Sequence, residues 1–147
     1  MSISASALTA TRLRMDVISE NVANMDTTRT EYGEPYRRKF VVFQERSNNR
    51  AFASHFQRAK GDSIFNRTPD APGGVRVIHI GRDMSDFKLD YNPSHPDADE
   101  NGFVRLPNVE VVQEMTDMMA AYRSYEANIT ALNVFKDMAT KTLEIGR

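Results

Sequence analysis

The sequence predicts an α+β fold, in which long N- and C-terminal helices form a coiled-coil-like part with a small β-rich insert between them. Both ends of the chain carry a heptad pattern of apolar residues, whereas the middle alternates with the period of β-strands. Gly and Pro are also concentrated in the middle. We therefore divide the 147 residues into an N-terminal helix at 1–31, an insert at 32–106, and a C-terminal helix at 107–147 that pairs with the first helix.

The N-terminal helix is predicted by seam positions that recur at alternating steps of four and three between residues 4 and 25. Neither Gly nor Pro interrupts the run before Gly33. We expect the apolar positions of this seam to pack against another helix, either in this chain or in a neighbouring subunit. They are Leu8, Met15, Ile18, Val22 and Met25.

The insert is predicted from short segments of strand-like residues at 39–44, 75–80 and 87–91. Pro and Gly residues between these segments indicate turns. Residues 46–72 carry little pattern, and we expect them to form a long, mobile loop.

The C-terminal helix has a longer seam with the same alternation of steps. Pro107 and Asn108 mark its start, with Asn108 as the expected N-cap, and Gly146 marks its end. A continuous helix of about 37 residues would measure roughly 55 Å. The seam residues that we expect to pack between helices or subunits are Val111, Met115, Met118, Tyr122, Tyr125, Ile129, Leu132 and Leu143.

Such a helix is too long for a compact domain of this chain, whose diameter would be roughly 38 Å. Its apolar seam must therefore be covered by the N-terminal helix, by other subunits, or by both. An ordinary intramolecular bundle is the alternative, although a bundle usually needs about three or four helices and only two long ones are visible.

Composition and motifs exclude several classes of function. The chain has 19 Lys and Arg against 20 Asp and Glu, and no Cys, so it has neither a strong net charge nor thiol chemistry. We expect no membrane span, because no apolar stretch approaches the roughly 20 residues that are needed, and no secretory signal. Nucleotide-binding and hydrolase motifs do not occur, so we expect neither an enzyme nor a cofactor.

A metal site is not expected either. Residues 97–102 copy the first half of a calcium-binding loop, but the twelfth position is Asn108 instead of the bidentate Glu that calcium requires. We interpret this segment as a polar turn before the C-terminal helix.

A small nucleic-acid-binding module is an alternative from a different class. The stretch 36–67 mixes basic and aromatic residues, as in Tyr36-Arg37-Arg38-Lys39-Phe40, and single-stranded nucleic acid is bound by such mixtures. The acidic block that follows would repel phosphate, so we do not expect nucleic acid as a partner.

Several motifs resemble those of a known family. Residues 14–18 and the stretch from Asn21 to Thr27 are similar to the N-terminal signature of bacterial flagellar rod and hook proteins, and 92–104, 107–109 and 114–147 narrow the resemblance to a proximal rod subunit. The resemblance covers roughly 4–43 and 73–147, and 46–72 do not match. The motif residues are Asn21, Asn24, Thr27, His95, Pro96, Asp97, Asp99, Gly102, Pro107, Asn108, Tyr125, Glu126 and Asn128.

The resemblance implies a structural subunit of the flagellar basal-body rod. Such a subunit would be exported unfolded by the flagellar type III apparatus, without a cleaved signal peptide, and would join a helical tube that crosses the periplasm, transmits motor torque and helps to form the export channel. Its implied partners are other rod proteins, copies of itself, and the MS-ring and export-gate end of the basal body. Another rod or hook subunit is the alternative within the same family.

Overall fold

The computed structural model describes residues 2–46 and 73–146. Its elements are α1 (Ser2–Ala23), β1 (Lys39–Glu45), β2 (Val75–Arg82), β3 (Lys88–Tyr91), β4 (Phe103–Leu106) and α3 (Val111–Ile145). Two terminal helices with a small β region between them confirm the α+β class. The mobile loop predicted at 46–72 lies outside the described residues from residue 47 onward.

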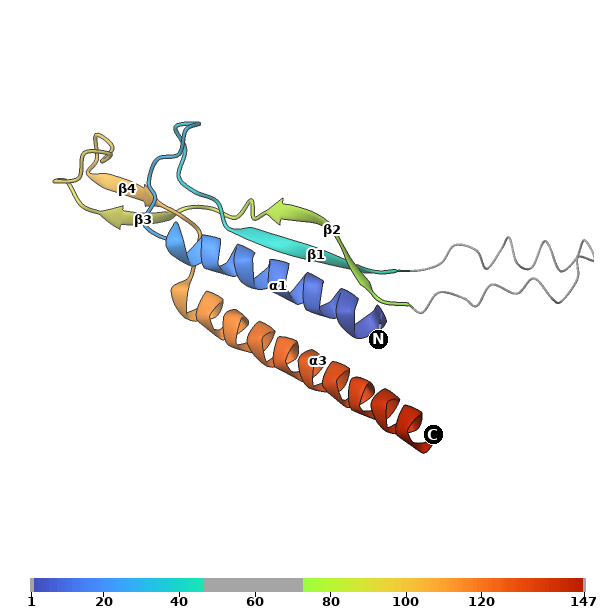
Figure 1. The fold of residues 1–147 in the computed structure, drawn as a ribbon. Helices are drawn as coiled ribbons and strands as arrows, with labels where there is room; N and C mark the ends of the chain where they lie inside the picture. The colour runs from blue at the N-terminus through green and yellow to red at the C-terminus, as the bar shows by residue number, and fades with distance from the viewer. Residues whose placement is uncertain (1, 47–72, 147) are drawn as a thin grey trace, which may run out of the picture.

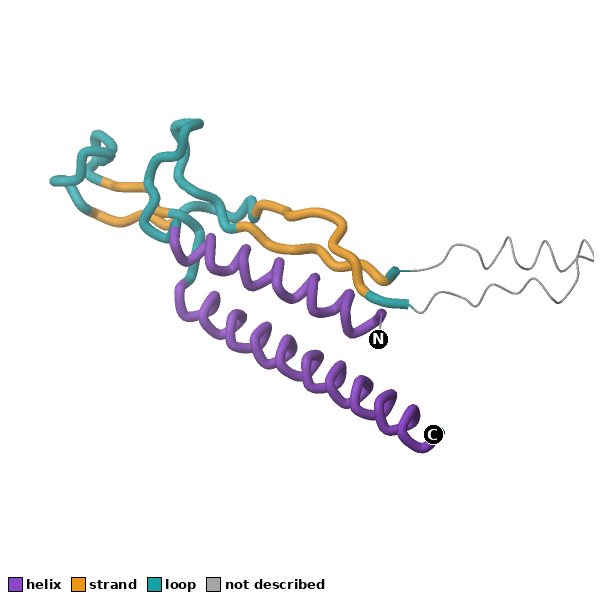
Figure 2. Tube along the Cα trace, in the orientation of Figure 1, coloured by secondary structure: helices purple, strands orange, loops and turns teal. Residues whose placement is uncertain are grey.

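The helices and strands lie in layers (Figure 1). The ribbon of β1 and β2 packs on one side of α1, and α3 packs on another, so that α1 contacts β1, β2 and α3. The two helices run antiparallel, and α3 continues beyond the N-terminus of α1 (Figure 2). The ribbon of β3 and β4 lies past the C-terminal end of α1.

Each of the two sheets is an antiparallel pair of strands. β1 pairs with β2, with a bulge between Val42 and Phe43, and β3 pairs with β4, where the rings of Tyr91 and Phe103 meet edge to face at 5.3 Å. Three strands lie where the alternation predicts them. β4 is not predicted, because its four residues are too short a run for a periodic signal.

The prediction that the first helix extends to residue 31 is wrong, since α1 ends at Ala23. The amide of Met25 bonds the carbonyl of Val22, three residues back, and the side-chain amide of Asn24 donates to the carbonyl of Glu20 over 2.9 Å. These bonds satisfy carbonyls that would otherwise accept from a further turn of helix. Met25 consequently lies outside the helix and is exposed.

The start of the second helix also differs from the prediction. α3 begins at Val111, and its N-cap position is Glu110, which makes no side-chain capping bond. Asn108 is not the cap, because its side chain binds other segments, as described below. The preceding Pro107 is fully buried.

The seam of α3 is rotated from the predicted one. Val111, Met118, Tyr125 and Leu132 are half-buried. Met115, Tyr122 and Ile129 are 57%, 59% and 38% exposed, so α1 does not cover them, and their packing between subunits stays a prediction. The alternate inward positions are Glu114, Ala121 and Asn128, each one residue earlier and therefore about 100° away around the helix. In α1, Ile18 is buried and Leu8, Met15 and Val22 are half-buried.

Two glycines provide a matched test of the loop geometry. Gly33 and Gly102 both have φ of 79°, but a Cβ on Gly102 would lie 3.0 Å from the Tyr91 ring and 3.2 Å from Pro93, whereas a Cβ on Gly33 would meet nothing within 4 Å. Gly33→Ala should therefore cost about 1 kcal/mol of left-handed strain alone, and Gly102→Ala should cost more because crowding is added. Native-state hydrogen exchange of the Asn92 amide, which bonds the Gly102 carbonyl, would report opening of the β3–β4 ribbon. Unchanged protection in Gly102→Ala would contradict this expectation.

Candidate assembly surface

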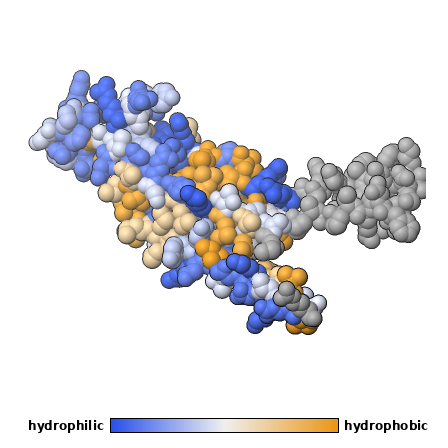
Figure 3. Space-filling view, viewed as in Figure 1, coloured by the Kyte–Doolittle hydropathy of each residue, from blue (hydrophilic) through white to orange (hydrophobic). Residues whose placement is uncertain are grey.

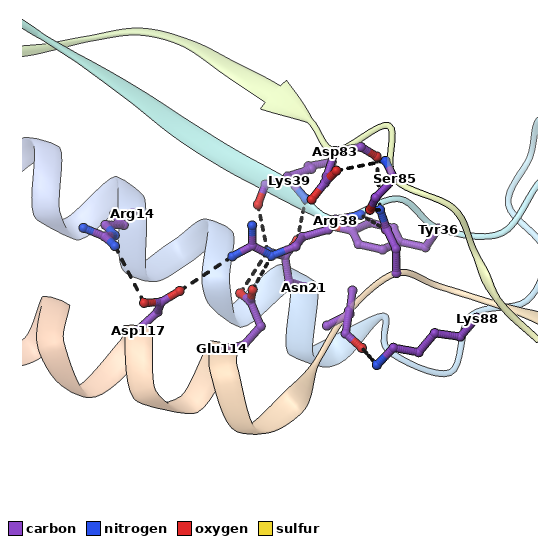
Figure 4. Close-up of polar contacts among 12 residues, drawn as sticks. Arg14, Asn21, Tyr36, Arg38, Lys39, Asp83, Ser85, Lys88, Glu114 and Asp117 are labelled. Carbon is purple, nitrogen blue, oxygen red and sulfur yellow. Dashed lines mark hydrogen bonds and ion pairs between the residues drawn. The ribbon is translucent and has the colours of Figure 1, made fainter.

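A buried polar cluster joins α1, the start of β1 and α3 (Figure 4). Its centre is Asn21, whose side chain is 0% exposed. The side-chain amide of Asn21 donates to the Lys39 carbonyl (2.8 Å) and to Glu114 Oε2 (3.0 Å). Its oxygen accepts from the Tyr36 hydroxyl and from the Lys39 amide, both at 2.9 Å. All the hydrogen-bonding capacity of this amide is therefore used inside the protein.

Glu114 connects this amide to a chain of charges. Its carboxylate is also 0% exposed and accepts from Arg38 Nε over 2.6 Å. The same guanidinium lies 3.6 Å from Asp117, which in turn lies 4.0 Å from Arg14 of α1. A buried carboxylate is stable only when it is paired and hydrogen-bonded, and Glu114 meets both conditions.

Asn108 is a second junction between distant segments. Its side-chain oxygen accepts from the Arg38 amide (2.8 Å), and its nitrogen donates to the Asp83 carbonyl (3.2 Å) and to Ser85 Oγ (2.8 Å). The amide and hydroxyl of Ser85 also hydrogen-bond the Asp83 carboxylate and lower its pKa. One side chain thus joins the start of β1, the end of β2 and the entry to α3.

Tyr36 lies beside the two acids of the cluster. Its burial, together with the negative charges of Glu20 and Glu114, raises the pKa of the phenol from 10.0 to about 12. Glu20 forms an ion pair with Lys39, whose ammonium lies 5.7 Å from the Tyr36 ring. The neutral hydroxyl is the form that can donate to Asn21.

The family-motif residues of the turns form local contacts. Thr27 Oγ1 donates to Asn24 Oδ1 over 3.3 Å. Asp97 accepts from Thr28 Oγ1 over 2.8 Å, and this bond connects the β3–β4 turn to the loop after α1. His95 Nδ1 accepts from the Asp97 amide, and the Asp99 carbonyl accepts from the Gly102 amide. Pro96 is exposed in the same turn.

The described part of the chain shows no site for a metal. Its His, Asp and Glu residues form no group of three or more that could hold an ion. The turn at 97–102 is closed by its own backbone bonds, from the Gly102 amide to the Asp99 carbonyl and from the Asp99 amide to the Phe103 carbonyl.

Three of the basic residues proposed for nucleic-acid binding, Arg37, Arg38 and Lys39, have side-chain partners within the chain. Arg38 and Lys39 belong to the buried cluster, and Arg37 donates to the Ser85 carbonyl and lies over the Phe87 ring at 4.2 Å. Residues 47–67 lie outside the described residues.

Two apolar surfaces of α3 face solvent (Figure 3). We call the first the α3 stripe; it lies on the half of the helix that packs against α1. Its members are Val112, Met115, Met119, Tyr122 and Ile129. We call the second the overhang, residues 133–145, where every residue is exposed. Its large apolar side chains are Val134, Phe135, Met138, Leu143 and Ile145.

The overhang exists because the two helices differ in length. α3 has 35 residues and α1 has 22, so α3 is 13 residues longer, or about 20 Å. Of the remaining motif residues on α3, Tyr125 is half-buried, Glu126 is exposed, and the Asn128 amide donates to the Ser124 carbonyl. No helix within the described residues is long and apolar enough to cross a membrane.

Uncovered apolar surfaces on long terminal helices are typical of a protein that binds other chains. Two family models identify the assembly. The model for flagella basal body rod protein matches residues 1–29, and the model for flagellar basal body rod FlgEFG protein C-terminal matches residues 100–145. The class is therefore that of the flagellar rod.

Curated relatives narrow this class. The flagellar basal-body rod protein FlgC of Bacillus subtilis is 48% identical over 100% of this chain and 96% of its own length. FlgC of Borreliella burgdorferi is 45% identical and FlgC of Salmonella typhimurium is 41% identical, each over 99% of this chain and 94% of the relative. The chain belongs to the FlgC family of flagellar basal-body rod proteins. It is a structural rod subunit in the flagellar basal body, where it assembles with other basal-body components.

Six residues of the buried cluster and its chain of charges were not among the predicted site residues: Arg14, Tyr36, Arg38, Lys39, Glu114 and Asp117. Glu114 lies on the same helical face as Met118 and Ala121, so an acid within an apolar stripe was the available signal. Arg38 gave no comparable signal, because its partner is 76 residues away in the chain.

Replacement of the buried acid should be far more costly than replacement of its exposed neighbour. Glu114→Ala leaves an Asn21 N–H and Arg38 without their partner, and should lower the free energy of unfolding by about 3 kcal/mol. Asp117→Ala removes an acid that is 26% exposed and should cost about 1 kcal/mol or less. Urea denaturation followed by circular dichroism compares the two variants, and equal losses would contradict the assigned role of Glu114.

The raised pKa of Tyr36 predicts alkaline destabilisation between pH 10 and about 12. Below pH 10 the phenol is protonated in both states, whereas within this window the unfolded chain loses the proton and the folded chain retains it, so stability falls as pH rises. Ultraviolet titration of the folded protein should show one of its five tyrosines ionising last. Tyr36→Phe should remove that late step; a late step that persists in this variant would exclude Tyr36 as its source.

Proposed function

We propose that this subunit joins the wall of the rod through the α3 stripe and the overhang, which pack against helices of neighbouring subunits. The exposure of the overhang carries the proposal: Phe135, Met138 and Leu143 are 46%, 51% and 76% exposed. An isolated helix of this length has little stability in water without packing of its apolar face. Neighbouring helices would supply the burial that offsets its ordering entropy.

The predicted packing residues would then serve two different interfaces. We assign the buried Ile18 and the half-buried Met118 and Tyr125 to the contact between α1 and α3. The exposed ones would contact other subunits, namely Met25, Met115, Tyr122, Ile129 and Leu143. Contacts between different faces of successive subunits do not close on themselves, and they generate helical assemblies such as a tube.

A tube of this kind would transmit motor torque and enclose part of the export channel. Interdigitated helices resist shear through many small van der Waals contacts spread along their length. Methionines such as Met115 and Met119 have flexible side chains that can pack against neighbours of different sequence. The proposed partners are copies of this chain, other rod proteins, and the MS-ring and export-gate end of the basal body.

We further propose that the chain is exported unfolded by the flagellar type III apparatus, without a cleaved signal peptide, and assembles in the periplasm. Its small interior supports this route. Among the described residues, the buried apolar side chains are Ala10, Val17, Ile18, Tyr36, Val104, Val109 and Ala121. A subunit with so few buried side chains has a modest free energy of unfolding before assembly.

A charge placed on the overhang should prevent rod assembly without unfolding the subunit. Phe135→Asp and Leu143→Asp introduce a carboxylate that a neighbouring helix would have to bury, whereas neither side chain is buried in the subunit. We expect loss of swimming and no rods in electron micrographs of isolated basal bodies. The melting temperature of the purified variants should remain within about 2 °C of the parent, since exposed substitutions have small effects.

Thr140→Asp is the matched control. It adds the same charge to the overhang, but residue 140 lies about 140° around the helix from residue 135. Because residue 140 lies only about 60° from Leu143, it is the control for Phe135→Asp. Rods and swimming should be normal in this variant. Normal rods in Phe135→Asp and Leu143→Asp would refute the role of the overhang.

A further inference from the structure

We propose that Glu114 is a positioning residue: held by Asn21 and Arg38, its carboxylate selects the heptad register in which α3 packs along α1. This assignment concerns the fold of the single subunit. It does not depend on the overhang binding a neighbour, although its importance for the rod rests on the proposed function.

Apolar packing alone does not determine the register. The half-buried residues Val111, Met118, Tyr125 and Leu132 recur every seven residues along α3. A displacement of α3 by one heptad therefore places an apolar side chain where another apolar side chain was. Because hydrophobic contact is non-directional, the displaced pairing retains much of the same burial.

The hydrogen bond between Asn21 and Glu114 distinguishes the two registers. Ala121 occupies the position one heptad after Glu114, and it is 3% exposed. In a displaced register Asn21 would face Ala121, whose side chain accepts no hydrogen bond. The buried amide would then have an unpaired N–H, and Arg38 would lose its contact of 2.6 Å to the carboxylate. A buried polar residue in a heptad seam specifies register in coiled coils for the same reason.

The consequence of a register change would reach the far end of the molecule. Seven residues of helix correspond to about 10 Å along the axis. A displaced α3 would carry the overhang by that distance relative to the β1–β2 ribbon. The overhang and the β1–β2 ribbon would therefore have a different relative position in each register. Neighbouring subunits that contact both could fit only one of the two registers.

The chain has no Cys, so two introduced cysteines can be labelled uniquely with nitroxides. Ala5 near the start of α1 and Gln113 near the start of α3 are both exposed and lie at opposite ends of the antiparallel pair. A change of register therefore changes their separation by nearly the full displacement. Pulsed electron spin resonance on the purified full chain would measure this distance.

The parent should show a single distance. Glu114→Leu removes the acceptor and should add a second population displaced by about 10 Å. Glu114→Gln retains an acceptor for Asn21 and should restore the single distance, and Asp117→Leu, the control at a neighbouring acid, should also retain it. If Glu114 only stabilises the fold, Glu114→Leu should lower the melting temperature and leave a single, unchanged distance between the two labels. That result would overturn the proposal.

A relocation variant tests the same idea if Glu114→Leu does not fold. Glu114→Ala combined with Ala121→Glu moves the carboxylate by one heptad, and in the original register this acid would be buried opposite no partner. We expect the main distance to lengthen by about 10 Å as α3 shifts to return a carboxylate to Asn21. An unchanged distance would show that the register is determined by apolar packing and by the segment that links β4 to α3. A relocation variant that does not fold would also count against the proposal that Glu114 selects the register.

Discussion

The rest of this structure depends on the hydrogen bonding of one buried amide, that of Asn21. Polar groups removed from water must find partners in the protein, and this side chain finds them in Tyr36 and Lys39 at the start of β1 and in Glu114 of α3. Glu114 extends the network to the Arg38 side chain, and the Arg38 amide extends it to Asn108. The position of α3 relative to α1 and the ribbon is therefore specified by directional bonds, in a molecule whose apolar interior is too thin to specify it alone.

The thin apolar interior leaves much of the apolar surface of α3 uncovered in the single subunit. α1 lies between the β1–β2 ribbon and α3, so its sides are largely occupied within the subunit. α3 contacts α1 along one narrow face and retains apolar residues on another, and its last 13 residues extend past α1. One long helix thus serves both the fold of the subunit and its assembly. A self-sufficient domain would bury that surface internally.

The family-motif residues contribute to geometry. Asn24 bonds the last turn of α1, Gly102 supplies a left-handed turn between β3 and β4, and Asp97 connects that turn to the loop after α1. None of them requires a ligand for these contacts. These contacts form turns and junctions between the loop after α1 and the β3–β4 turn.

The sequence by itself determined the two helices, three of the four strands and the rod family, because periodicity and motifs are local properties that the order of residues records directly. Only the tertiary structure decided which face of α3 meets α1, that Glu114 is buried, and that Asn108 joins strands instead of capping a helix. Each of these outcomes depends on a partner distant in the chain, such as Arg38 for Glu114. A heptad pattern shows that a helix has an apolar side, but the direction of that side is chosen by the neighbour it meets.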